Sequence, residues 1–446
     1  MVDVLPEHRR SADDGTGGTA RGADGATANT GTGTGTGKVR RQLPRWSEIR
    51  PLLRARPFIA DGVDRRLSRA HTIGDLRALA RRRVPRSVFD YVDGAAESEI
   101  GIARARGAYR RVEFRPRVLR DVTSVDTSVD VVGRSSALPL VLAPTGFTRM
   151  MHHEGEIAVA RAAAAAGVPY TLSTMGTTSV EDLVRAVPEG RNWFQLYLWR
   201  DREASARLLD RVIAAGVEAL VLTVDTPVGG LRTRDVRNGL TVPPALSPRT
   251  LADMSLHPAW WLNLLTTEPL EFASMSSWNG TVEDLVQQMF DPGASMADLD
   301  WLRDRWPGKL IVKGIQHVSD ATAVVELGAD AVVVSTHGGR QLDRAPAPLE
   351  LLPGVVRAVG DRAEVLIDTG MSSGADLVAA RALGASAGMV GRAYLFGLMA
   401  GGRRGVGHAL GILAREAART LQLLGVPRMT DVSGEHAVLR GAVAEP

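Results

Sequence analysis

Short apolar runs rich in β-branched residues recur through the last two thirds of the chain, and each is followed by a pattern typical of a helix. In the helical patterns, apolar positions lie three or four residues apart. The uninterrupted apolar runs are typical of strands that are buried on both faces, as in a parallel sheet. We predict eight strands, at 138–143, 169–173, 193–198, 219–225, 310–313, 331–335, 364–368 and 388–391.

Helices are expected between these strands, for example at 156–166, 202–215 and 375–383. Eight strand–helix units favour an α/β fold of the (β/α)8 or TIM barrel type over an open, doubly wound sheet. The interval 226–309 separates the fourth strand from the fifth and is far longer than an ordinary connection. It predicts a long insertion, which we expect at the catalytic face of the barrel.

The regions outside the barrel differ from it in composition. Residues 1–45 are rich in Gly and Thr and cannot bury enough apolar surface to fold, so a disordered tail is expected. Within 46–137, helical patterns begin near Thr72 and Pro85 and predict a helical segment that leads into the barrel. The barrel is expected over 138–430, and a C-terminal tail over 431–446.

The overall composition narrows the classes of protein. Hydrophobic residues make up 44% of the 446 residues and charged residues 23%, as in ordinary soluble proteins. Cysteine is absent, which excludes disulfides, thiolate metal ligands and cysteine nucleophiles, and we expect no metal. The net charge of +4 gives no reason to expect a nucleic-acid partner. No apolar run reaches the roughly 20 residues of a membrane span, and we see no export signal, so the expected location is the cytoplasm.

The stretch STHGGRQLD, residues 335–343, follows the sixth predicted strand and carries candidate chemistry. His337 has an ordinary pKa near neutrality, which suits proton transfer. Arg340 offers a planar fork that matches a carboxylate. The glycines between them let a flat cofactor or substrate approach the backbone. Taken alone, the stretch is equally compatible with an ordinary turn in which both side chains are solvated.

Polar or glycine residues stand at nearly every strand end, where barrel enzymes collect their chemistry. Such a recurrence favours a functional rim over chance. The rim residues are Ala143, Pro144, Thr145, Gly146, Ser173, Gln195, Tyr197, Thr223, Asp225, Lys313, His337, Arg340, Asp368, Gly370, Gly391 and Arg392.

Several motifs together resemble the FMN-dependent α-hydroxy acid oxidase and dehydrogenase family over about residues 70–430. They are APTG, TLST, FQLY, LTVDTP, VKGI, STHGGRQLD and VGRA. The segments HPAWW, LLTTEPL and DRAP are most similar to its bacterial, quinone-linked L-lactate dehydrogenases. The resemblance implies a TIM barrel that holds FMN.

The resemblance also implies a role for each matching residue. The catalytic group comprises His337 as the base, Asp225 as its carboxylate partner, Tyr197 near the substrate hydroxyl, and Lys313 beside the N1 and O2 edge of the flavin. The substrate carboxylate is expected to contact Tyr91, Arg340 and Arg232. The FMN contacts are expected from Ala143, Pro144, Thr145, Gly146, Ser173, Gln195, Thr223, Lys313, Asp368, Gly370, Ser372, Gly391 and Arg392.

Two positions depart from the pattern of the family. Thr336 stands where the family commonly has Asn, and Ser372 stands where many members have a phosphate-binding Arg. The hydroxyls of Ser372 and Ser373 are candidates to replace that Arg. These departures support one alternative of a different class, a flavin-binding sensor or interaction module that no longer turns over.

The expected activity is oxidation of an (S)-2-hydroxy acid, L-lactate to pyruvate, with electrons passed to a quinone. The alternative acceptor is O2, which would make the protein an oxidase that releases hydrogen peroxide. The resemblance implies a quinone from Gly146, since family dehydrogenases often carry Gly there and oxidases Ala. The apolar patch Trp260-Trp261-Leu262 is compatible with a peripheral contact at the inner face of the cell membrane, and equally with a cap packed over the barrel or against a neighbouring subunit. A homotetramer is expected by analogy with the family. The choice between hydride and carbanion chemistry stays open.

Overall fold

The structure is a computed structural model, and it describes residues 42–53, 58–240, 246–275 and 290–441. The chain divides into two units, Met1–Phe58 and Ile59–Pro446. Within the first unit, the described residues form one short helix, α1 (Trp46–Ile49). The predicted tail over 1–45 lies almost entirely outside the described residues.

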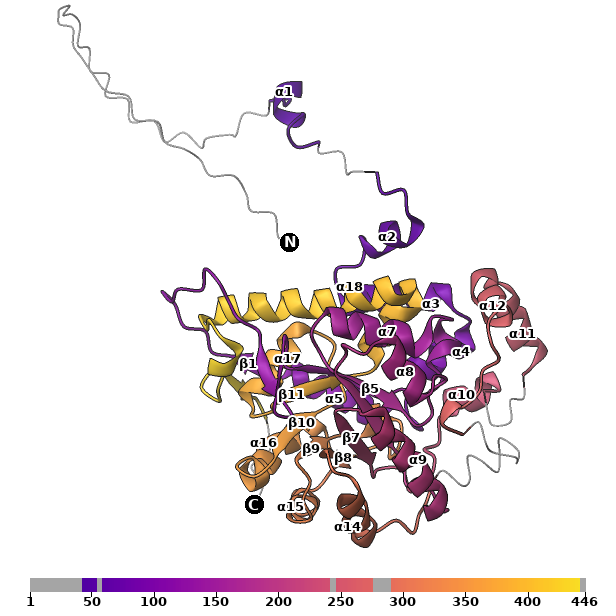
Figure 1. Ribbon diagram of the computed structural model, residues 1–446. Coiled ribbons are helices and arrows are strands. Elements are labelled where there is room, and N and C mark those ends of the chain that lie inside the picture. Colours follow the sequence, from indigo (N-terminus) through magenta and orange to yellow (C-terminus); the bar gives the residue numbers. More distant parts are fainter. Residues whose placement is uncertain (1–41, 54–57, 241–245, 276–289, 442–446) are drawn as a thin grey trace, which may run out of the picture. The chain divides into compact units, whose positions relative to one another are not determined.

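Eight parallel strands close into a barrel in the second unit, as the sequence predicted (Figure 1). They follow one another around the barrel in chain order, with the last strand beside the first. The strands are β4 (Leu140–Leu142), β5 (Tyr170–Ser173), β6 (Asn192–Leu196), β7 (Ala219–Thr223), β8 (Lys309–Ile315), β9 (Ala331–Val334), β10 (Glu364–Ile367) and β11 (Ala387–Val390).

Alternate residues of each strand face two separate apolar layers. On β4, for example, Leu140 and Leu142 pack toward the surrounding helices, whereas Val141 packs inside the barrel with Trp193. This alternation explains why the strands appear in the sequence as continuous apolar runs. A hairpin of β2 (Val129–Val131) and β3 (Arg134–Ser136) contributes valines to the inner layer.

Helices surround the barrel and cover its outer face (Figure 1). The last of them is interrupted at Gly401 and Gly402, where the backbone leaves helical geometry. The helices are α6 (Thr148–Met151), α7 (Gly155–Ala165), α8 (Val180–Ala186), α9 (Arg202–Ala215), α14 (Met296–Arg305), α15 (Val318–Glu326), α16 (Pro348–Val359), α17 (Gly374–Ala382) and α18 (Arg392–Leu424).

An N-terminal helical segment precedes the barrel: α2 (Gly62–Leu67), α3 (Ile73–Arg83), α4 (Arg86–Asp93) and α5 (Ile100–Arg110). Thr72 caps α3 through a reciprocal pair of hydrogen bonds with Asp75. Strand β1 (Val112–Phe114) then pairs antiparallel with β12 (Ala437–Leu439). Part of the interval that we predicted to be a C-terminal tail therefore belongs to a sheet. Its partner lies more than 300 residues away along the chain, so no local pattern marks the pairing.

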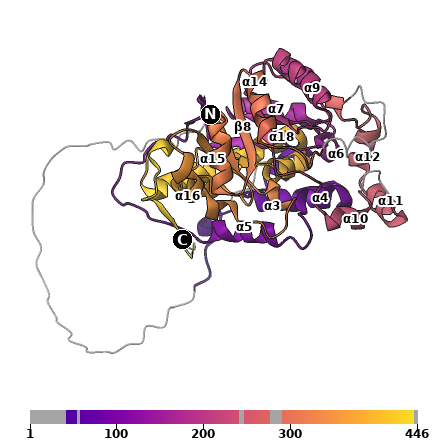
Figure 2. The ribbon, with the colours of Figure 1, turned by 90° about the horizontal axis from the view of Figure 1, so that it is seen from below.

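The insertion after β7 contains α10 (Thr233–Asn238), α11 (Pro248–Ser255), α12 (Pro258–Leu265) and η1 (Ala273–Met275). The first three lie beside α4 (Figure 2). The backbone N–H of Arg86 on α4 donates to Asp253 on α11 at 2.7 Å. Phe272 is buried against Phe147. The insertion therefore contacts the loops that follow the barrel strands, as predicted.

Glu156 on α7 is fully buried and holds the loop that follows β5. Its carboxylate accepts the backbone N–H and hydroxyl of Thr177, both at 2.7 Å, and the hydroxyl of Thr178 at 3.0 Å. We predict that Glu156→Gln lowers the free energy of unfolding by about 1–3 kcal/mol, because an amide cannot accept all of these donors. Urea denaturation measures the change, with the exposed Glu189→Gln as a control. Equal stability of the two variants would contradict the prediction.

Candidate active site

A histidine–carboxylate pair lies at the rim of the barrel. His337 follows β9 in a left-handed conformation with φ of +55°, and its backbone N–H donates to the Ser335 hydroxyl at 3.0 Å. Its Nδ1 lies 3.0 Å from Oδ1 of Asp225, which follows β7. The Asp225 side chain is 2% exposed and that of His337 is 26% exposed. The pair therefore directs the other ring nitrogen of His337 away from the carboxylate, where it can reach a substrate.

The charge state of Asp225 follows from its neighbours. Burial alone would raise the pKa of this carboxyl, but the charge and hydrogen bond of His337 and the charge of Lys313 lower it below its ordinary value. Asp225 is therefore ionised at neutral pH. An ionised partner accepts the Nδ1 proton and so fixes the Nδ1–H tautomer of His337.

A buried ammonium lies next to this pair. Lys313 on β8 is 3% exposed, and its Nζ lies 3.0 Å from Oδ2 of Asp368 and 2.9 Å from the Ser335 hydroxyl. Burial lowers the pKa of Lys313, but the charges of Asp368 and Asp225 outweigh burial and raise it above its ordinary value. The barrel therefore holds a permanent positive charge at its rim.

Two arginines flank the ring of Tyr91, which comes from α4. The guanidinium carbons of Arg340 and Arg232 lie 4.9 Å and 5.4 Å from the ring centroid. Burial, and next the charge of Arg232, lowers the pKa of Arg340. The positive charges of the two arginines repel each other. An anion bound by both arginines would offset this repulsion. The sequence predictions for these three residues thus fall on one cluster that suits a carboxylate.

Tyr197 lies beyond the end of β6 and is 7% exposed. Burial, and then the charges of Asp225 and Tyr91, raises the pKa of its phenol. The hydroxyl therefore stays protonated and can donate to developing negative charge. The ring of Phe290, at the far end of the insertion, meets that of Tyr197 edge to face at 5.8 Å.

Buried polar atoms without partners identify the place for a flavin ring. Among the described residues, Nε2 of Gln195 and the hydroxyl of Thr223 have no hydrogen-bond partner, although both are buried. The Ser173 hydroxyl donates to Oε1 of Gln195 at 3.0 Å, so these groups share one patch of the rim. Buried polar groups are costly to leave unpaired. The polar edge of an isoalloxazine ring would satisfy them, and the residues fit FMN.

The APTG run follows β4 and forms hydrogen bonds with the hydroxyl of Tyr394. The hydroxyl of Tyr394 donates to the Ala143 carbonyl at 2.9 Å and lies 2.6 Å from the Thr145 hydroxyl. A side chain at Gly146 would meet Cβ of Met175 at 3.0 Å, so the loop packs tightly against the end of β5. Pro144 lies within the same fixed run. Tyr394 and Met175 therefore fix the position of the loop.

Arg392 lies at the other end of the candidate flavin site. It follows Gly391 and is the first residue of α18. Its guanidinium donates to the carbonyls of Val92, Gly338 and Gly94 at 2.9, 2.8 and 2.6 Å. Burial, then the charges of Arg340 and Arg106, lowers its pKa to about 9. Arg392 therefore stays charged at neutral pH, and among the described residues it has no ion-pair partner.

The two serines at this end do not have the role that we expected. The Ser373 hydroxyl caps α17, and the backbone N–H groups of Ser372 and Ser373 both donate to Asp376, at 2.7 and 2.9 Å. The Ser373 hydroxyl accepts the backbone N–H of Asp376 at 3.1 Å. A phosphate at these hydroxyls would face that carboxyl, so the serines are poor replacements for an arginine.

Arg106 on α5 lies near the same end, and no sequence motif pointed to it. A side chain at Gly370, where φ is +99°, would meet the backbone nitrogen of Arg106 at 3.2 Å. Burial lowers the pKa of Arg106, and its own charge lowers that of Arg392. In the part of the chain that the structure describes, its guanidinium has no hydrogen-bond partner. An Arg on an amphipathic helix is usually a solvated residue, which is why the pattern did not distinguish it.

Thr336 makes contacts that suit its position. It is 4% exposed, and its hydroxyl lies 3.3 Å from that of Thr369, which in turn donates to Asp368 at 2.7 Å. The Thr369 hydroxyl also accepts the backbone N–H of Gly338 at 2.9 Å. The threonine that replaces the usual Asn therefore joins the polar chain that supports Lys313 and the loop after β9.

A histidine with a carboxylate partner, a buried ammonium and a pair of arginines all lie at the rim of a (β/α)8 barrel, an arrangement that suits oxidation of small acids by a flavin. The chain belongs to the FMN-dependent dehydrogenase family, whose model matches residues 80–439. It is an enzyme of the class that oxidises (S)-2-hydroxy acids with FMN.

Relatives in several bacteria support this assignment. An L-lactate dehydrogenase of Caulobacter vibrioides is 43% identical over 366 residues, which cover 80% of this chain and 95% of the relative. A Mycobacterium tuberculosis protein is 56% identical over 398 residues, covering 89% and 96%, and its assignment as an L-lactate dehydrogenase is provisional.

Solved structures give the same fold. The structure of (S)-mandelate dehydrogenase, a monotopic membrane protein, matches with a TM-score of 0.80 and 38% identity, over 83% of this chain and 100% of that chain. A mandelate oxidase variant matches with a TM-score of 0.71 and 38% identity, over 84% and 100%. Both dehydrogenases and oxidases therefore share this barrel.

We predict that Asp368→Asn lowers the free energy of unfolding by about 3 kcal/mol, since it removes one partner of a buried ammonium. Asp225 remains near Lys313, which keeps the loss at the lower end of the usual range. Asp361→Asn is the control, because Asp361 is 82% exposed and its contact with Arg362 is 3.9 Å long; it should cost less than about 1 kcal/mol. Chemical denaturation of both variants decides, and similar losses would contradict the prediction.

Proposed function

We propose that this protein oxidises L-lactate to pyruvate with bound FMN and passes the electrons to a quinone. The observation that carries the proposal is the His337–Asp225 pair, 3.0 Å apart, beside the Arg340, Arg232 and Tyr91 cluster. A base and a carboxylate clamp on one rim match the two functional groups of a 2-hydroxy acid. The relatives named L-lactate dehydrogenase support lactate as the substrate.

The arginines bind and orient the substrate in this proposal. Arg340 and Arg232 hold its carboxylate with charge-assisted hydrogen bonds, and the repulsion between their charges is relieved on binding. The Arg340 guanidinium is itself held by the backbone carbonyls of Tyr91 and Gly94. A guanidinium held in this way loses little freedom when the acid binds.

His337 takes up a proton from the substrate as the carbon that bears the hydroxyl is oxidised. Asp225 stabilises the imidazolium that forms, and the Tyr197 hydroxyl donates to the substrate oxygen. FMN, when bound, supplies the chemistry of accepting the two electrons of the substrate. Lys313 offers its fixed positive charge to the edge of the ring where negative charge develops. Both the hydride and the carbanion route are compatible with these roles.

The FMN phosphate is proposed to lie at the end formed by Gly370, Gly391 and Arg392. We further propose that Arg106 supplies the positive charge that Ser372 lacks, because its guanidinium is partly buried, lacks a partner and faces Arg392 closely enough to lower its pKa. Two neighbouring arginines that have no ion-pair partner among the described residues favour a dianionic ligand.

A quinone acceptor is proposed over O2 on two observations. Exposed apolar side chains on α11 and α12 offer a contact with the membrane, where quinones dissolve. The matched (S)-mandelate dehydrogenase structure is described as monotopic. No helix among the described residues is long and apolar enough to cross a bilayer. The proposed location is the cytoplasm with peripheral contact at the inner face of the cell membrane, and the proposed assembly is a homotetramer.

We predict that His337→Gln retains FMN but slows the anaerobic bleaching of the flavin by L-lactate about 10²–10⁴-fold, because the base is lost. Stopped-flow absorbance measures the rate. His71→Gln, on an exposed residue ahead of α3, should reduce at the rate of the unaltered protein. A His337→Gln variant that bleaches at full rate would remove His337 from the mechanism, and a protein that L-lactate never bleaches would overturn the proposed function.

For the phosphate end, we predict that Arg106→Gln weakens FMN binding roughly tenfold or more, which is the usual effect of losing a hydrogen bond to a charged group. Binding is measured by quenching of flavin fluorescence. Riboflavin has no phosphate, so its affinity should be the same in the variant and in the unaltered protein. Arg110→Gln, an exposed residue of the same helix, is the control. A comparable loss for riboflavin would show that Arg106 acts elsewhere.

The acceptor is tested after reduction by L-lactate. We predict that a soluble quinone analogue reoxidises the flavin at least tenfold faster than air-saturated buffer does, with less than stoichiometric peroxide. Stopped-flow traces and a peroxide assay give the two quantities. Rapid reoxidation in air with one peroxide per lactate would make the protein an oxidase.

A further inference from the structure

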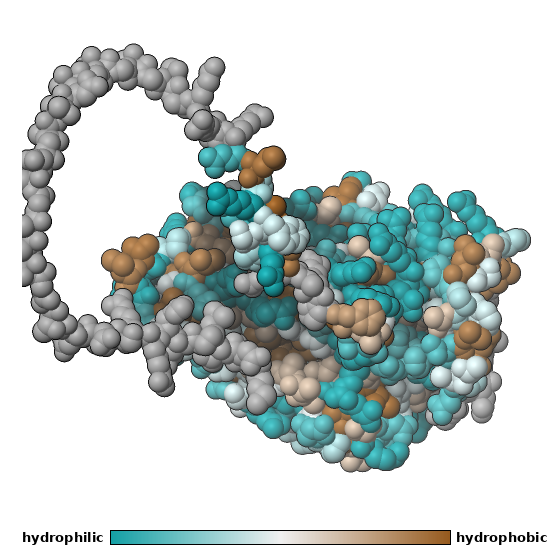
Figure 3. All heavy atoms as spheres, turned by 90° about the horizontal axis from the view of Figure 1, so that it is seen from above, coloured by the Kyte–Doolittle hydropathy of each residue, from teal (hydrophilic) through white to brown (hydrophobic). Residues whose placement is uncertain are grey.

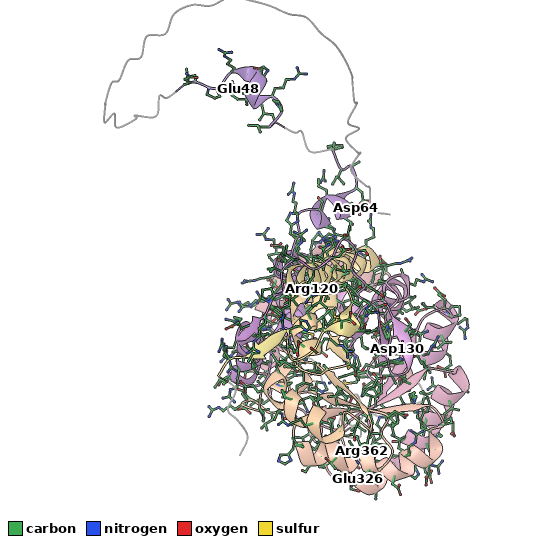
Figure 4. All side chains as sticks on the ribbon, turned by 90° about the vertical axis from the view of Figure 1, so that its left-hand side faces the viewer. Glu48, Asp64, Arg120, Asp130, Glu326 and Arg362 are labelled. Carbon is green, nitrogen blue, oxygen red and sulfur yellow. The ribbon has the colours of Figure 1, made fainter. Side chains whose placement is uncertain are left out.

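A second cavity, of about 270 Å³, shares no residue with the active site and is lined by parts of α2, α3, α12 and α18. Four arginines line it: Arg66, Arg83, Arg403 and Arg404. In Figure 4, Asp64 marks α2 at one end of the second unit, and Arg362 lies at the opposite end. The cavity therefore belongs to the end of the barrel unit that carries α2.

Most of this positive charge is not neutralised. Arg404 pairs with Asp61 and Asp64 at 3.0 and 3.1 Å. For Arg66, Arg83 and Arg403, the described part of the chain contains no ion-pair partner, and Nε of Arg66 is buried without a hydrogen bond. Burial, and next the charge of Arg83, lowers the pKa of Arg66. The charges of Arg83 and Arg404 thus both act against the charge of Arg66 in the lining of the cavity.

The carboxylate in the lining is already committed to the backbone. Glu154 accepts the N–H of Arg403 at 2.7 Å, at the point where α18 resumes after its interruption. A side chain at Gly402, where φ is +59°, would meet the Glu154 carboxylate at 2.5 Å. Glu154 therefore caps the second part of α18 and does not form an ion pair with the arginines.

A metal cation fits this cavity less well than an anion does. Ligand atoms of His152, His153 and Glu154 lie within 4.8 Å of one another, close enough for one ion. Burial lowers the pKa of His152 to about 4, so its imidazole is neutral and adds no charge. The repulsion from four arginines in the same lining would oppose a divalent cation. Arginine forks match a phosphate group.

An apolar surface adjoins the cavity. Trp260 on α12 lines the cavity, and its indole N–H donates to the Met150 carbonyl at 2.8 Å, which holds α12 against the barrel. Leucines on α11 and α12 point outward instead; the exposed ones are Leu251, Leu256, Leu262 and Leu265, at 53%, 77%, 49% and 74%. Figure 3 shows the face that carries α2 and α18, with apolar residues (brown) at its right-hand end among hydrophilic ones.

We propose that this cavity binds the phosphate of an anionic phospholipid while the leucines of α11 and α12 enter the boundary of the acyl chains. Charge complementarity selects the headgroup, and the adjoining leucines select a lipid over a free phosphate. The inference rests on the membrane contact of the proposed function and names the residues that recognise the lipid.

The test compares two double variants with equal loss of charge. Arg66→Gln/Arg83→Gln removes two lining arginines, whereas Arg65→Gln/Arg82→Gln removes their exposed neighbours on α2 and α3. Cosedimentation with vesicles of phosphatidylglycerol and phosphatidylcholine should weaken about tenfold or more for the first pair. The second pair should lose about threefold or less, since it reduces only diffuse attraction. Equal losses would overturn the cavity as the site.

Further arms separate the sources of the phosphate. Leu262→Ser/Leu265→Ser should abolish vesicle binding but keep the stabilisation by millimolar inorganic phosphate in a thermal melt. Arg66→Gln/Arg83→Gln should lose that stabilisation. If the unaltered protein is stabilised by phosphate but does not bind the vesicles, the lipid assignment is overturned. If Zn²⁺ stabilises the protein and phosphate does not, the cavity is a cation site.

Activity provides the final control. With L-lactate and a soluble acceptor, the Arg66→Gln/Arg83→Gln and Arg65→Gln/Arg82→Gln variants should turn over at the rate of the unaltered protein. None of these four arginines belongs to the active site. Unchanged vesicle binding by the Arg66→Gln/Arg83→Gln variant of a protein that L-lactate reduces would mark a failure of this inference alone, whereas an unaltered protein that L-lactate does not reduce would mark a failure of the proposed function.

Discussion

The buried charge network between β7, β8, β9 and β10 is the interaction on which the site depends. Lys313 is paired with Asp368 and lies near Asp225, which in turn holds His337. A buried charge is costly without a partner. Lys313 and Asp368 compensate each other at 3.0 Å, and Asp225 lies near the charge of Lys313 and bonds to His337. The closed barrel brings the four strand ends together, so the fold itself provides the compensation. Removing one member leaves another buried charge without its partner.

Elements from outside the barrel complete the rim. Tyr91 comes from α4, Arg232 from the insertion, and Phe290 from the end of that insertion, where its ring meets Tyr197. The barrel thus supplies the His337–Asp225 pair, Lys313 and Arg340, whereas the added segments bring Tyr91 and Arg232 beside Arg340. Added segments of this kind can vary without changes to the charge network of the barrel.

The sequence predicted the eight strands, and the structure brings many of the predicted site residues together at one rim. Strands buried on both faces appear as apolar runs, and their ends must meet at one rim once the barrel closes. The prediction failed where a role depends on a distant partner. Strand β12 forms by pairing with β1, and the backbone N–H groups of Ser372 and Ser373 donate to the carboxylate of Asp376. The sequence did not indicate a role for Arg106, because its neighbours along α5 do not show that it lies near Arg392 in the folded chain.

By itself, the sequence determined the class of fold, the strand ends and the residue types available there, because hydrophobic periodicity and motif spacing are local properties. The tertiary structure alone decided which of these groups share a contact and what each contact does to their charge. Distances of about 3 Å between residues more than 50 positions apart set the ionisation of Asp225 and Lys313. The arginines around the second cavity come from three helices, so their mutual repulsion exists only in the folded chain.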